Sequence, residues 1–86
     1  MSLIQQAEAA LCAVLMLHPE QIDEASALVL PEDFLSEQNQ KIYAAIIELD
    51  ANHHAVDAMA VASKTGDMAY LGGLIANAPY GTASSF

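Results

Sequence analysis

The chain has 86 residues and a net charge of −9, and hydrophobic residues make up 55% of it. This length allows one domain, and the alanine-rich hydrophobic share favours packed helices over a sheet. Lys41 and Lys64 are the only lysine or arginine residues, which argues against binding to nucleic acids or anionic membranes, since both need several cations.

The first predicted helix covers residues 3–17. One face at the three- and four-residue spacing consists of Ile4, Ala7, Leu11, Val14 and Leu15. From Ala9 to Leu17 the other faces are apolar as well, and a helix that is apolar all round is covered on all sides. We therefore expect this helix to be central in the domain or to lie at an oligomer interface. Its apolar run is too short to span a bilayer.

Cys12, the single cysteine, lies within this apolar run. No disulfide can form inside one chain, which fits a reducing compartment, and we expect a cytoplasmic protein. We expect a buried structural thiol rather than a nucleophile, because no histidine has an evident geometric link to it.

The second helix is predicted from Pro19 to about Val29, after the break at His18-Pro19. Ile22, Ala25 and Val29 are expected to face the core, and Leu30-Pro31 ends the helix. Phe34 stands in the following turn as the largest apolar side chain of its neighbourhood. We expect it to plug the core where two helices meet.

Ser36 can cap the third helix, which is predicted to run to about Ala51. Its predicted buried stripe consists of Ile42, Tyr43, Ile46, Ile47 and Leu49. The loop that follows contains His53-His54, a pair that resembles metal ligands. Neighbouring side chains on a loop rarely converge on one ion, so we expect a solvated turn.

Asp57 is predicted to cap a short fourth helix that ends near Ser63, with Gly66 as its left-handed exit. Asp67 can cap a last helix, predicted from Met68 to Ala78. Its inward residues are expected to be Tyr70, Leu71, Leu74 and Ile75.

Gly72 and Gly73 inside this last helix cost roughly 1 kcal/mol each relative to alanine. Either close backbone packing offsets that cost or the helix bends there. Because glycines let a second backbone approach closely, we take the pair as a candidate interface. Pro79 and Gly81 end the helix, and residues 82–86 are expected to form a flexible tail.

Together these elements predict an all-α fold, a small orthogonal bundle of about five helices around the apolar first helix, in a single domain spanning residues 1–86. The predicted core consists of Leu11, Leu15, Ile22, Phe34, Ile42, Tyr43, Ile46, Tyr70, Leu71 and Leu74.

No catalytic, cofactor or metal site is predicted. The sequence has no phosphate-loop motif, no zinc-ligand spacing and no assignable Ser-His-Asp set. Glu32-Asp33 could do acid-base work, but paired acids in a proline turn are more often exposed caps. An interaction module is therefore the default. Its acids either keep an apolar domain in solution or contact a basic protein partner.

The order and spacing of these residues make the chain similar to the N-terminal domain of DnaB-type replicative DNA helicases. The first part of the resemblance rests on Glu8, Leu11, Leu15, Pro19, Ile22, Pro31, Asp33, Phe34, Ile42, Tyr43, Ile46, Leu49, Val56 and Asp57. The later segment "GDMAYLGGLIANAP" resembles the family's pattern at Gly66, Ala69, Tyr70, Leu71, Leu74 and Pro79. The resemblance covers nearly the whole chain.

The resemblance implies a helical head that contributes to the N-terminal collar of a hexamer and docks primase or a helicase loader during DNA replication. This head is expected to self-associate, as a dimer in isolation and within a hexamer in the parent protein. In the family a helical hairpin, a linker and a RecA-like ATPase domain follow. ATP and Mg²⁺ would act in that ATPase domain, so this part of the protein is not expected to be an enzyme.

Three departures from the family pattern suggest a divergent member, from a phage or mobile element, or a paralogous helicase-associated protein. Ala13 stands where the family usually has glycine, the helix after Asp57 is shorter, and basic residues near Lys41 are missing. Two other classes remain as alternatives. One is a free-standing helical dimerisation module. The other is an acyl-carrier-like protein, which needs an Asp-Ser-Leu tripeptide that the sequence lacks.

Overall fold

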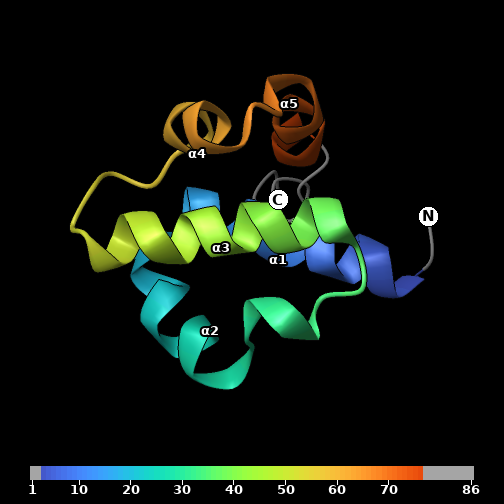
Figure 1. Ribbon diagram of the computed structural model, residues 1–86, viewed down its shortest axis with the longest axis horizontal. Coiled ribbons are helices and arrows are strands. Elements are labelled where there is room, and N and C mark those ends of the chain that lie inside the picture. Colours follow the sequence, from blue (N-terminus) through green and yellow to red (C-terminus); the bar gives the residue numbers. More distant parts are fainter. Residues whose placement is uncertain (1–2, 77–86) are drawn as a thin grey trace, which may run out of the picture.

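The computed structural model describes residues 3–76, and its regular elements in that range are all helical (Figure 1). In chain order they are α1 (Leu3–Leu17), the 3₁₀ turn η1 (Pro19–Gln21), α2 (Ile22–Leu28), the 3₁₀ turn η2 (Pro31–Asp33), α3 (Glu37–Ala51), α4 (Ala58–Thr65) and α5 (Met68–Ala76). The all-α prediction is confirmed. The expected tail at 82–86 and the last predicted turn of α5 lie outside the described residues.

The helix ends follow local signals that the sequence contains. Ser36 caps α3, because its hydroxyl oxygen accepts a hydrogen bond from the Asn39 N–H at 3.3 Å. The Asp57 carboxylate caps α4 in the same way. Gly66 ends α4 with a φ of 77°, a left-handed conformation that glycine adopts without strain. The fourth helix continues two residues beyond the predicted end at Ser63.

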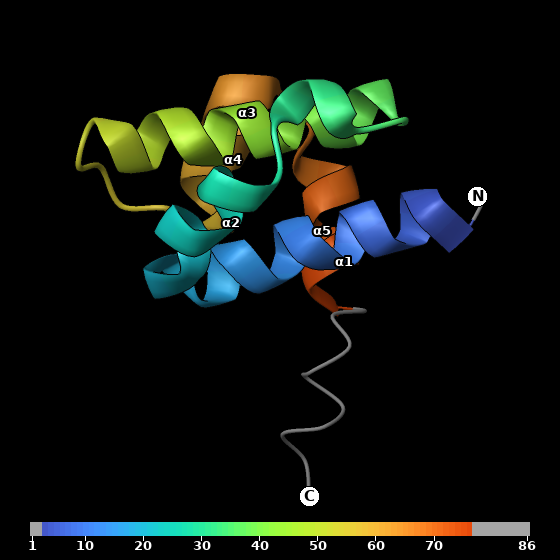
Figure 2. The same cartoon turned by 90° about the horizontal axis from the view of Figure 1, so that it is seen from below.

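The helices pack in two groups on either side of α3. Figure 1 shows α4 and α5 above α3 and α2 below it, and the turned view in Figure 2 shows α1 alongside α3. α3 contacts α1, α4, α2 and η2, whereas α1 contacts α3, α5 and η1. The apolar first helix therefore has close neighbours on one side, and part of its surface is exposed.

The structure buries one side of α1, which overlaps only in part with the apolar face found from spacing. The buried residues of α1 are Glu8, Ala9, Cys12, Ala13, Leu15 and Met16. Ile4 is 58% exposed, Ala7 is exposed, and Leu11 and Val14 are only partly buried. Spacing alone does not identify the buried side of this helix, because apolar residues surround it. Glu8 lies on the buried side of α1, where its carboxylate forms the hydrogen bonds described below.

The core lies between α3 and the other elements. Of the ten predicted core residues, the structure buries Leu15, Ile22, Phe34, Ile42, Tyr43, Ile46 and Leu71, and it packs the partly buried Leu11, Tyr70 and Leu74 against them. The same cluster also contains Cys12, Met16, Ala45, Leu49, Val56, Val61 and Ala62.

Phe34 and Tyr43 join the α2–η2 segment to α3. The two rings stack with centroids 4.6 Å apart and planes 25° from parallel. The Tyr43 hydroxyl lies 2.6 Å from the Val29 carbonyl and 3.1 Å from the Ala25 carbonyl, both able to accept its proton. These contacts hold the end of α2 against α3. Phe34 is buried between the two segments, as predicted.

Candidate functional site

The acidic and histidine residues considered as possible active-site groups either stabilise a turn or, in the part of the chain that the structure describes, are exposed without further metal-binding side chains around them. The Asp33 carboxylate accepts a hydrogen bond from the Leu30 N–H at 2.9 Å and so closes the turn η2. His53 and His54 are exposed on the loop after α3. Across residues 3–76, no group of three or more histidine, cysteine or acidic side chains is placed to hold a metal ion.

Cys12 is fully buried, and its thiol lies 3.8 Å from the Asn39 carbonyl oxygen. Burial, together with the nearby charge of Glu8, raises the pKa of Cys12 to about 12. Because the thiolate is the nucleophilic form, this side chain is unreactive near neutral pH. Cys12 is thus part of the core.

A buried polar cluster joins α1 to the start of α3. The Glu8 carboxylate accepts hydrogen bonds from the N–H groups of Leu35 and Ser36. The Asn39 side chain, which is completely buried, donates to the Gln5 carbonyl oxygen at 3.1 Å and lies 3.5 Å from the Glu8 carboxylate. The cluster therefore satisfies the polar groups where the chain enters α3.

Tyr70 extends this cluster to α5, because its hydroxyl donates a hydrogen bond to the Asn39 side-chain oxygen. Burial raises the pKa of Tyr70, so the hydroxyl keeps the proton that it donates. Tyr70 is among the predicted core residues but Asn39 is not, since a polar residue in a first helical turn usually faces water. Glu8, an isolated acid in an apolar helix, was the available signal.

Several large apolar side chains are exposed on the surface and are not part of the core. They are Leu3, Ile4 and Leu17 on α1, Leu28, Leu30 and Leu35 around η2, Met59 on α4 and Met68 on α5. Single exposed apolar residues are normal, but residues gathered on one face mark an interaction surface. On α1, Leu3 and Leu17 lie on one face together with the exposed Ala7 and so meet that description, whereas Ile4 lies about 100° round the helix from Leu3.

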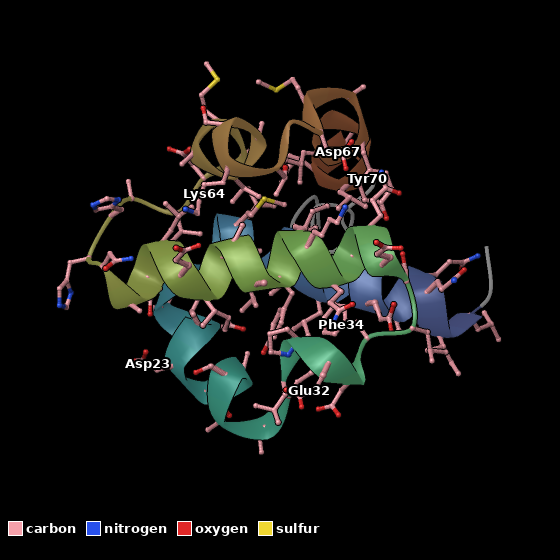
Figure 3. All side chains as sticks on the ribbon, viewed as in Figure 1. Asp23, Glu32, Phe34, Lys64, Asp67 and Tyr70 are labelled. Atoms are coloured by element: carbon pink, nitrogen blue, oxygen red, sulfur yellow. The ribbon has the colours of Figure 1, made fainter. Side chains whose placement is uncertain are left out.

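The charges are distributed unevenly over the surface. Both lysines line an open groove of about 460 Å³ between α3 and α4, where Lys64 pairs with Glu48 at 3.1 Å. The acids on η1, α2 and η2 are Glu20, Asp23, Glu24, Glu32 and Asp33. Figure 3 shows Lys64 on one side of α3, and Asp23 and Glu32 on the other. Each lysine has an acidic partner, so the groove is not a strong anion site.

Gly72 and Gly73 are exposed on α5, which continues as one helix from Met68 to Ala76. A Cβ added to either glycine would meet no described atom within 4 Å. Within residues 3–76, close backbone packing therefore does not explain the pair. Their role at an interface stays a prediction.

None of the helices between residues 3 and 76 is long and apolar enough to cross a bilayer.

Comparison with known proteins gives one match and two negative results. The family model described as the DnaB-like helicase N terminal domain matches residues 2–85. No curated protein and no solved structure matches the chain. The family match covers the residues that form the polar cluster and the exposed face of α1.

Proposed function

Because this chain belongs to the DnaB-like helicase N-terminal domain family, we propose that it is an interaction and oligomerisation domain of a replicative DNA helicase. It contributes to the N-terminal collar of the hexamer and docks primase or a helicase loader. The observation that carries the proposal is the apolar surface of α1, exposed in a domain whose polar cluster and cysteine serve its own fold. The part of the protein that would use ATP and Mg²⁺ is a separate ATPase domain.

Neither ATP hydrolysis nor duplex DNA binding is expected of this chain near physiological salt. The sequence has no phosphate-loop motif, and two lysines cannot replace enough counterions on DNA. A coupled ATPase assay and a mobility shift with labelled duplex provide the measurements, with a DNA-binding protein of similar size as positive control. A DNA shift that weakens as salt rises, obtained with nuclease-free protein, would contradict the second half.

Self-association is expected, as a dimer that strengthens when the salt concentration is raised. Each copy has a net charge of −9, so repulsion opposes association at low salt and screening relieves it. Sedimentation at about 100 µM in low and high salt is the measurement, since the Debye length falls from about 30 Å at 0.01 M to about 8 Å at 0.15 M. A monomer under both conditions would contradict the proposal.

A free-standing dimerisation module would give the same sedimentation result, because the exposed apolar face of α1 fits both candidate functions. The gene sequence after the codon for Phe86 distinguishes a helicase domain from a free-standing module, according to whether it encodes a phosphate loop. A phosphate loop in that reading frame supports the helicase role, and its absence from the whole frame supports the free-standing module.

A further inference from the structure

We propose that the outer face of α1 is a self-complementary surface on which a second copy of this chain packs in antiparallel orientation. We define the outer face as Leu3, Ala7, Ala10, Val14 and Leu17. The inference rests on the proposed self-association and names the surface that carries it.

The five residues alternate at four- and three-residue spacing, which is the spacing of a seam between two packed helices. They lie on the side of α1 opposite Cys12 and Met16, which face α3 and the core. Leu3 is 83% exposed and Leu17 is 43% exposed, while Ala10 and Val14 are partly exposed. The core therefore leaves this seam available.

The symmetry of the side chains along the seam favours a second copy as the partner. Leu3 and Leu17 each lie seven positions from Ala10. A two-fold axis at Ala10 thus places Leu3 opposite Leu17 of the second copy at both ends, with the small alanines at the crossing. Small side chains there let the two backbones approach closely. An isologous contact of this kind needs a surface that is complementary to itself.

Charge and folding energy favour the same contact. The seam contains no ionisable side chain, although the chain as a whole has a net charge of −9. The repulsion between copies therefore comes from groups outside the contact, where salt screens it. α1 is already folded against α3, so association does not have to form the helix. The seam is about 22 Å long, which places it among small and reversible interfaces.

Ala10→Glu tests the seam, because it places two carboxylates face to face at the two-fold axis. We expect it to weaken the dimer by about tenfold or more in sedimentation at matched salt. Ala27→Glu is the matched control, since Ala27 is an exposed helical alanine on α2 and the charge change is the same. Circular dichroism and thermal unfolding of both variants separate loss of association from loss of fold.

A second pair of variants tests the orientation and does not depend on Ala10. Leu3→Glu alone is expected to weaken the dimer, because its carboxylate would face Leu17 of the second copy. Leu3→Glu combined with Leu17→Lys is expected to restore association and to make it weaken with added salt. An antiparallel contact pairs opposite charges at both ends, whereas a parallel contact pairs like charges.

The outcomes separate this inference from the proposed function. A monomeric wild-type chain at both salt concentrations overturns self-association itself. A wild-type dimer that Ala10→Glu affects no more than Ala27→Glu overturns only the seam and leaves another interface. Unfolding caused by Ala10→Glu, together with a double variant that fails to restore association, shows that the chain's own segments cover this face and also overturns the seam.

Discussion

Replacing Phe34 by alanine should lower the free energy of unfolding by about 3–5 kcal/mol, the usual cost of removing a buried phenylalanine ring. The ring is only 8% exposed and stacks on Tyr43, so its loss leaves a cavity between η2 and α3. Urea denaturation followed by circular dichroism measures the change.

Two controls sharpen this experiment. Phe34→Leu fills most of the same space and should cost clearly less than alanine. Leu35→Ala removes an adjacent side chain that is 66% exposed and should change stability little. An unchanged denaturation midpoint for Phe34→Ala would rule out the role as a core plug.

Replacing Glu8 by alanine should cost about 3 kcal/mol or more, since hydrogen bonds to a charged group contribute about 1.5–3 kcal/mol each. The substitution leaves the N–H groups of Leu35 and Ser36 without the carboxylate that accepts from both. Glu8→Gln keeps one acceptor oxygen, so its free energy of unfolding in urea denaturation should lie between those of the wild type and Glu8→Ala.

Glu24→Ala is the matched control for Glu8, because it removes an exposed acid from another helix and changes the net charge equally. We expect it to be neutral or slightly stabilising in a chain with this excess of acids. Equal effects of the two alanine substitutions would mean that the Glu8 carboxylate does not hold the loop before α3.

The helix ends were predicted well because they depend on residues close to them in the sequence. The capping side chains of Ser36 and Asp57, the left-handed Gly66 and the residue before Pro31 all act within a few positions of themselves. Helix limits therefore came close to those in the structure without knowledge of packing. The matching family model confirms the resemblance that the spacing of these elements suggested.

The polar cluster could not be predicted in the same way, because its bonds join distant parts of the chain. Glu8 is 27 positions from Leu35, Asn39 is 34 from Gln5, and Tyr70 is 31 from Asn39. The buried side of α1 could not be predicted for the same reason. An apolar pattern on every side of a helix carries no information about which side is buried, and a long-range contact has to decide.

The α2 side of the molecule is more acidic than the α4 side, because the five acids on η1, α2 and η2 have no lysine among them, whereas Glu37 and Glu48 on α3 pair with Lys41 and Lys64. A cationic protein is therefore attracted more strongly to the α2 side during its approach. Orientation of this kind raises the rate of productive encounters without adding a contact to the final complex. Association with a basic partner would accordingly slow as salt is added, while dissociation of the formed complex would change much less.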